Sequence, residues 1–138
     1  AGSEIDGRVI PSDLSLDGMI SKKKDFIGKR SLNREAFLNP EREKIVGVVP
    51  VDKKTMIPEG SHIVSDGNAQ LPNKKLGHVS ASCWSVEYNN PFSLAILKDG
   101  KKKIGDKLFA LCPLKNKNIA VEIVSSHYVD PKGERVRS

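Results

Sequence analysis

The amino-acid sequence predicts a mainly β domain, a small antiparallel barrel or sandwich with one short helix before its strands. About six short runs of apolar and β-branched residues follow one another at near-regular spacing after residue 40. Turn-forming residues are frequent, with 11 Gly and 8 Pro among 138 residues. Apolar residues recur at helical spacing in a single segment, and that segment precedes the strands.

The first segment, residues 4–20, has turn signals but neither a strand period nor a helix period. Its apolar residues have no partner within the segment; they are Leu14, Leu16, Met19 and Ile20. We expect this segment to be loosely held and to pack against something outside it. The opening Ala1-Gly2-Ser3 looks like a cloning remnant.

A helix is predicted over roughly residues 28–39. Leu32, Ala36 and Phe37 recur there at helical spacing. Asp25 stands just before this run, where a carboxylate can cap the free amides of the first turn. Asn39-Pro40 ends the helix, because proline disfavours the α conformation in the residue before it.

Strand-type segments fill the rest of the chain. We predict strands at residues 44–49, 62–65, 75–84, 92–97, 107–112 and 119–124. A tight turn is predicted at Pro58-Glu59-Gly60, and hairpin turns are predicted at Asp66-Gly67-Asn68, Asp99-Gly100 and Ile104-Gly105-Asp106. Closing the strands into a barrel would leave no exposed sheet edge.

The chain is basic, with a net charge of +6 and a pI near 9.4. Its lysines occur in short bursts beside turn residues, which is typical of solvated loop tips. A basic barrel can bind nucleic acid, but binding to single strands needs aromatic platforms, and aromatic residues make up only 5% of the chain. We therefore expect no nucleic-acid partner and keep a basic nucleic-acid-binding barrel as a remote alternative.

Cys83 and Cys112 each lie in an apolar, strand-like run. Two cysteines without close spacing form neither a zinc site nor a disulfide framework. We expect both thiols to be buried, reduced and slow to react, in a cytoplasmic protein. No apolar run approaches the roughly 18 residues of a membrane helix, so we expect no membrane partner.

The sequence shows no catalytic constellation. The histidines His62, His78 and His127 lie far apart along the chain and lack a matched acid or nucleophile. There is no Gly-rich phosphate loop and no nucleophile turn. We therefore predict no catalytic residue and no metal ligand in this chain.

One segment carries a specific motif. Lys24-Asp25-Phe26-Ile27-Gly28-Lys29 resembles a signature found late in the glycine cleavage T-protein family of aminomethyltransferases. The preceding lysines and the continuation Arg30-Ser31-Leu32 look most like the sarcosine oxidase alpha-subunit branch. Residues 77–85, 93–97 and 128–135 resemble later family segments in the same order. Ser85-Val86 departs from a family serine–proline, and the loop at 87–91 is unusual.

This resemblance implies a six-stranded Greek-key β-barrel with one short N-terminal helix, the aminomethyltransferase C-terminal barrel. It implies that residues 21–138 form the barrel domain and that residues 1–20 are the cloning remnant and the tail end of a preceding folate-binding domain. The implied parent is a tetrahydrofolate-dependent sarcosine oxidase. Such an enzyme demethylates sarcosine oxidatively to glycine and captures the one-carbon unit as methylene-tetrahydrofolate.

The implied cofactors of the parent complex are tetrahydrofolate, a flavin (FAD or FMN) and NAD, with none bound to this segment, which is expected to be inactive alone. The implied partners are the preceding folate domain of the same chain and other oxidase subunits. Trp84 and Tyr88 are the candidate side chains at the mouth of a folate channel. The alternative parents are a glycine cleavage T-protein and a dimethylglycine dehydrogenase-like enzyme.

Overall fold

Six antiparallel strands form a closed barrel in the computed structural model, which describes residues 4–69 and 74–137. The strands are β1 (Glu43–Pro50), β2 (His62–Val64), β3 (Gly77–Ser85), β4 (Asn90–Lys98), β5 (Lys107–Cys112) and β6 (Lys117–Val124). The prediction of a mainly β barrel is confirmed, and every predicted strand is present. The supposed cloning remnant at residues 1–3 lies outside the described residues.

The strand order around the barrel is β1-β4-β3-β2-β5-β6, and β6 pairs with β1 to close it. β2, β3 and β4 pair in succession, and β5 returns to lie beside β2, which is a Greek-key arrangement. β4 and β5 therefore follow each other in the chain without pairing. The hairpin turns predicted at Asp99-Gly100 and at Ile104-Gly105-Asp106 are wrong. Both lie in the β4–β5 connection, where the short 3₁₀ helix η4 (Gly100–Lys103) carries the chain across to a different neighbour.

The core is built from small and β-branched side chains that alternate into the barrel. Val46 and Val48 of β1, and Val121 and Ile123 of β6, are almost completely buried. Alternate residues of a strand point to opposite faces, so one face of each strand supplies the interior. Burying each such side chain contributes about 1.5–3 kcal/mol relative to leaving it in water.

The predicted helix over residues 28–39 is present only in part. A 3₁₀ helix, η3 (Lys29–Asn33), is followed by a single α-helical turn, α1 (Glu35–Leu38). Arg34 between them is extended, with ψ 142°. Ser and Asn compete with the helical hydrogen bonds through their own side chains, and Ser31 and Asn33 both lie in this stretch. The predicted end of the helix before Asn39 is confirmed.

Asp25 does not cap the helix, so that prediction is wrong. No side-chain cap is present at η3, and its N-cap residue is Gly28, with φ +92°. The Asp25 carboxylate is fully exposed and instead accepts a hydrogen bond from Lys29 Nζ at 3.1 Å. An exposed pair of this kind contributes little to stability.

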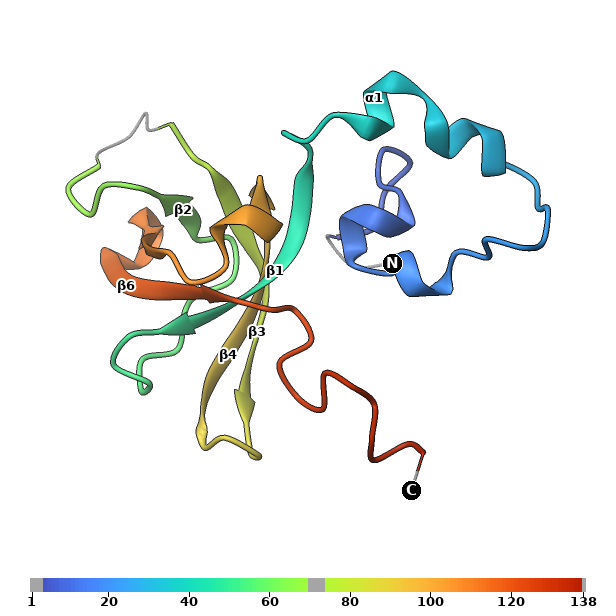
Figure 1. Cartoon of the computed structure of the whole chain (residues 1–138). Helices are drawn as coiled ribbons and strands as arrows, with labels where there is room; N and C mark the ends of the chain where they lie inside the picture. The colour runs from blue at the N-terminus through green and yellow to red at the C-terminus, as the bar shows by residue number, and fades with distance from the viewer. Residues whose placement is uncertain (1–3, 70–73, 138) are drawn as a thin grey trace.

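The N-terminal segment lies beside the barrel next to β1 (Figure 1). Its 3₁₀ helix η1 (Pro11–Leu14) carries Asp13, which is only 3% exposed. The Asp13 carboxylate forms ion pairs with Arg42 and with Lys44 of β1. The expectation of a loosely held segment is therefore not supported at η1, because two ion pairs tie it to the barrel.

The predicted turn at Pro58-Glu59-Gly60 is confirmed. Gly60 has a φ of +76°, and the Ser61 amide donates to the Pro58 carbonyl at 3.2 Å. The Ala69 amide donates to the Asp66 carbonyl at 3.1 Å, so a turn is present there too, but it lies within the long connection from Val64 to Gly77 and is not the predicted hairpin turn. Within the described ranges, no helix is both long enough and apolar enough to cross a membrane.

Candidate functional site

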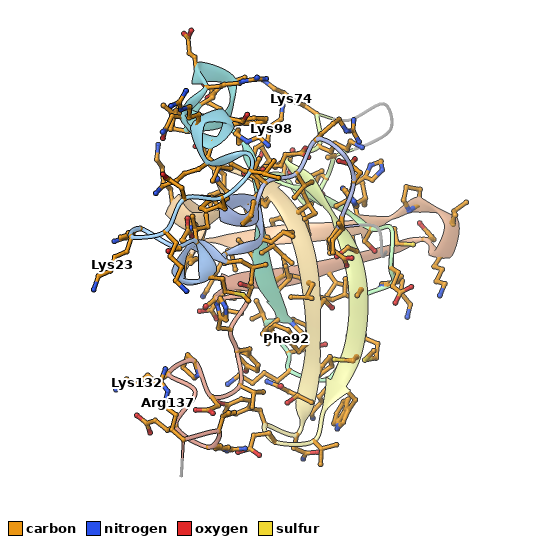
Figure 2. All side chains as sticks on the ribbon, turned by 90° about the vertical axis from the view of Figure 1, so that its right-hand side faces the viewer. Lys23, Lys74, Phe92, Lys98, Lys132 and Arg137 are labelled. Atoms are coloured by element: carbon orange, nitrogen blue, oxygen red, sulfur yellow. The ribbon has the colours of Figure 1, made fainter. Side chains whose placement is uncertain are left out.

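The β3–β4 hairpin and the tail that follows β6 carry most of the exposed aromatic surface. In the hairpin, Ser85 pairs with Asn90, Trp84 with Pro91 and Cys83 with Phe92. The tail leaves β6 and runs beside the far end of this hairpin (Figure 1). Figure 2 shows Phe92 on β4, and Lys132 and Arg137 on the tail below it.

Tyr128 fastens the tail to the hairpin. Its ring stacks on Phe92, with centroids 4.7 Å apart and an interplanar angle of 12°. It also meets the Tyr88 ring at 4.6 Å, tilted by 55°. Its hydroxyl oxygen accepts a hydrogen bond from Asn90 Nδ2 at 3.2 Å. Ring pairs of this geometry contribute about 0.5–1.5 kcal/mol beyond the area that they bury.

A second contact joins the same two elements. Arg135 of the tail pairs with Glu87 of the hairpin turn, with Arg135 Nη2 2.5 Å from Glu87 Oε1. The hydrogen bond from Arg135 lowers the pKa of the Glu87 carboxyl. Both groups are exposed, so we assign the pair a role in orienting the tail and little weight in stability.

The two candidate residues, Trp84 and Tyr88, lie on the same hairpin but on different faces of it. Tyr88 lies against Tyr128, which stacks on the Phe92 face. Trp84 pairs with Pro91, one step along the strand, and successive side chains alternate between faces. Both are about half exposed, at 47% and 48%. The structure therefore does not bring Trp84 and Tyr88 together into one aromatic platform.

Sequence reasoning missed Phe92 and Tyr128 as parts of this cluster. They lie 36 positions apart, and neither stands in a recognisable motif. Their contact depends on the direction in which the tail leaves β6. No local pattern carries that information, because aromatic residues in a strand and in a tail serve equally well in a core.

The lysine bursts lie on exposed turns and are partly paired. Lys101 Nζ lies 2.7 Å from Asp17 Oδ2, and Lys102 Nζ lies 3.7 Å from Asp99 Oδ1. The hydrogen bond from Lys101 lowers the pKa of Asp17. Lys23 projects from its loop away from the barrel (Figure 2). These features agree with the prediction of solvated loop tips.

The N-terminal segment also presents an apolar hollow of about 530 Å³. Met19 is 80% exposed and Ile27 is fully exposed, while Leu16 and Phe26 are about 40% exposed. Large apolar side chains gathered around one exposed hollow are a feature of surfaces that pack against another protein or domain. They include residues that the sequence had left without partners.

The two cysteines have different environments, which corrects the expectation that both are buried. Cys112 is 6% exposed, whereas Cys83 is an exposed free thiol on the outer face of the hairpin. We expect a thiol reagent to label Cys83 rapidly in native buffer and Cys112 only after unfolding, because access limits the reaction. Time-resolved labelling followed by mass spectrometry measures both. Equal rates would contradict this assignment, and Cys83→Ser supplies the control that should lose the fast phase.

The histidines are arranged differently from what their spacing suggested. His62 and His78 are directly opposite each other on β2 and β3, while His127 lies in the tail after β6. In the part of the chain that the structure describes, no group of three or more His, Cys, Asp or Glu side chains is placed to hold a metal ion.

Comparison with known proteins gives a consistent set of relatives. The sequence matches the model of the glycine cleavage T-protein C-terminal barrel domain over residues 43–130. It is 32% identical over 135 residues to the sarcosine oxidase subunit alpha of Rhizobium meliloti (strain 1021), and 35% identical over 136 residues to that of Corynebacterium sp. (strain P-1). Each match covers 97% of this chain but only 14% of the relative.

Two aminomethyltransferases are also similar. The aminomethyltransferase of Thermosipho melanesiensis is 24% identical over 89% of this chain and 31% of its own length. The crystal structure of glycine cleavage system aminomethyltransferase T from Bartonella henselae has a TM-score of 0.62 at 20% identity. That match covers 87% of this chain and 32% of the other, and it shows a shared fold.

Proposed function

The chain belongs to the family of glycine cleavage T-protein C-terminal barrel domains, and on this premise we propose that it is the C-terminal barrel of a sarcosine oxidase alpha subunit. Its role is to pack on the folate domain that precedes it in the parent chain. The parent oxidises sarcosine to glycine and captures the one-carbon unit as methylene-tetrahydrofolate. The observation that carries this proposal is the 32–35% identity to alpha subunits over 97% of the chain.

The alternative is the same barrel in a glycine cleavage T-protein or a dimethylglycine dehydrogenase-like enzyme. The match to the Thermosipho melanesiensis aminomethyltransferase favours it. That match has lower identity and covers less of this chain than the matches to the alpha subunits. The sarcosine oxidase branch is therefore the better-supported parent.

The exposed apolar hollow of the N-terminal segment supports packing against another domain. Leu16, Met19, Phe26 and Ile27 present apolar surface next to the part of the chain that would continue into the folate domain. Covering these side chains removes apolar area from water, which stabilises the contact. In this proposal residues 1–20 are the end of the preceding domain together with the cloning remnant, and residues 21–138 are the barrel domain.

The cofactors of the proposed parent are tetrahydrofolate, a flavin and NAD. The described residues do not fit a folate pocket, because a pterin ring needs an enclosed apolar cleft with placed donors and acceptors. The rings of Tyr88, Phe92 and Tyr128 are stacked on one another, and Trp84 lies on the other face of the hairpin. In this proposal Trp84 and Tyr88 border the folate channel only after the barrel has packed on its neighbour.

The remaining parts of the proposal concern the assembly. The alpha subunits that this chain resembles are named as subunits, so we place the parent in a hetero-oligomer with other oxidase subunits. We propose a cytoplasmic complex without nucleic-acid or membrane partners. The segment alone has no oxidase or aminomethyltransferase activity, since the flavin and the folate pocket belong to other parts of the parent.

We expect the 138-residue chain to bind tetrahydrofolate weakly and with strong dependence on salt. Its exposed lysines attract the glutamate tail, but no pocket among the described residues orients the pterin ring. Exposed charges are screened over roughly 8 Å at physiological ionic strength. Calorimetry with mono- and polyglutamyl tetrahydrofolate at low and high salt measures this. Salt-insensitive binding in the low micromolar range would contradict the proposal, and a longer chain that includes the preceding domain is the positive control.

A further inference from the structure

His62 and His78 form a cross-strand pair in the barrel wall. They are directly opposite in the register of β2 and β3. The Val79 amide donates to the Ser61 carbonyl at 2.9 Å, so the neighbouring rung is the hydrogen-bonded one. His62 and His78 therefore occupy a non-hydrogen-bonded rung, where Cα atoms lie about 4.5 Å apart and side chains approach closely.

Both imidazoles lie on the outer face of the barrel. The flanking residues Ser61 and Ile63 of β2, and Gly77 and Val79 of β3, are buried, and alternate residues face opposite ways. Each histidine is half-buried, so water and small ions reach it. On the same outer ladder His78 is paired with Ile96 and His62 with Leu111. His78 also lines a hollow together with Asp6 and Arg42, so charged side chains lie on one side of the pair.

We propose that His62 and His78 together bind one divalent transition-metal ion of the imidazole-preferring class, with water completing its coordination. Metal–nitrogen bonds of about 2.0–2.1 Å require the two donor nitrogens to be about 3 Å apart. Cβ atoms about 4.5–5.5 Å apart on opposite residues allow this. Affinity should follow the general order for such ions, with copper above nickel and zinc.

The bound ion would link β2 to β3, the neighbouring strands that share the fewest backbone pairs. β2 has three residues, and within the described residues it pairs with β3 at two positions. By contrast, β3 pairs with β4 at eight positions and β5 pairs with β6 at six. A bridge between His62 and His78 therefore adds a cross-link where the fewest backbone pairs hold neighbouring strands.

The test is a titration of the 138-residue chain with Ni²⁺ and with Zn²⁺, monitored by calorimetry and by the thermal unfolding midpoint. Every protein carries Cys83→Ser, because an exposed thiol is itself a metal ligand. The variants are His62→Gln and His78→Gln, with His127→Gln as the matched control. Circular dichroism without metal checks that each variant is folded.

We expect the parent and His127→Gln to bind one ion per chain and to unfold at a higher temperature with metal. A ligand that binds only the folded state stabilises that state. Both effects should be lost in His62→Gln and in His78→Gln. Retention of the binding in either of these variants would overturn the proposal. The proposal would also be overturned by an adventitious ion only, which would appear as several weak sites without a change in the thermal unfolding midpoint.

Discussion

Gly77→Ala is expected to destabilise the protein by about 3 kcal/mol, a large fraction of the roughly 5–15 kcal/mol that stabilises a folded domain. Gly77 begins β3 and pairs with Leu97 of β4 and with Ile63 of β2. A Cβ atom at this position would lie 2.0 Å from the Ile96 carbonyl oxygen and 2.8 Å from Leu97 Cα. These are backbone atoms, so no side-chain rotation relieves the clash.

Denaturant unfolding followed by circular dichroism measures this effect. Gly18→Ala is the matched control, because a Cβ at Gly18 meets nothing within 4 Å and its φ needs no glycine. The control should change stability by no more than about 0.5 kcal/mol. If Gly77→Ala is as stable as this control, β4 has room to move away from β3, and the close packing of these two strands is not required for folding.

Asp13→Asn is expected to cost about 3 kcal/mol. Breaking a buried ion pair from one side leaves the partner charges without compensation, and this usually costs several kcal/mol. Here the side chain of Asp13 is 5% exposed, and its partners Arg42 and Lys44 are 20% and 14% exposed. The asparagine keeps the size of the side chain, so the loss reports on charge rather than on a cavity.

Asp6→Asn provides the comparison. Asp6 pairs with Arg8 at 2.5 Å, but both side chains are exposed, Asp6 to 44% and Arg8 to 91%. Exposed pairs are worth about 0–1 kcal/mol, so this variant should unfold close to the parent. Equal effects of the two substitutions would show that burial of Asp13 against the barrel adds nothing to its ion pairs.

The same carboxylate should make stability depend on acid. Burial alone would raise the pKa of Asp13, but hydrogen bonds from Arg42 and Lys44 outweigh it and hold the pKa below its usual value. A depressed folded-state pKa contributes stability that is complete above the unfolded pKa of about 3.9 and is lost as the pH falls through the folded value. Below about pH 4, the free energy of unfolding should therefore decrease more steeply with falling pH for the parent than for Asp13→Asn. Denaturant unfolding at a series of pH values measures this.

Most of the barrel could be predicted because each strand carries its own burial pattern. In β6, Ile119, Val121 and Ile123 are β-branched and buried at every second residue, with exposed residues between them, as a strand with one buried face requires. The helix was predicted less well. Its apolar spacing was real, but extended Arg34 divides it into a 3₁₀ helix and a single α-helical turn, and Gly28 rather than Asp25 precedes its first turn.

The candidate surfaces could be predicted only in part. The sequence drew attention to Trp84, Tyr88 and the unpartnered apolar residues of the first segment. Trp84, Tyr88, Leu16 and Met19 are exposed, whereas Leu14 and Ile20 are half-buried. It gave no sign that Trp84 and Tyr88 lie on different faces, or that Tyr128 would stack on Phe92. It also placed Cys83 in the interior, because an apolar run does not reveal which of its residues extend beyond the barrel end.

The sequence by itself determined the strand segments, the turn at Pro58-Glu59-Gly60 and the family. Strand period and turn chemistry are local, and the family motifs keep their order along the chain. The tertiary structure alone decided which strands are neighbours. Closure of β6 on β1, the rung that sets His62 opposite His78, and the burial of Asp13 against β1 join residues far apart in sequence. These contacts depend on how the whole barrel closes, and no local window of sequence records that geometry.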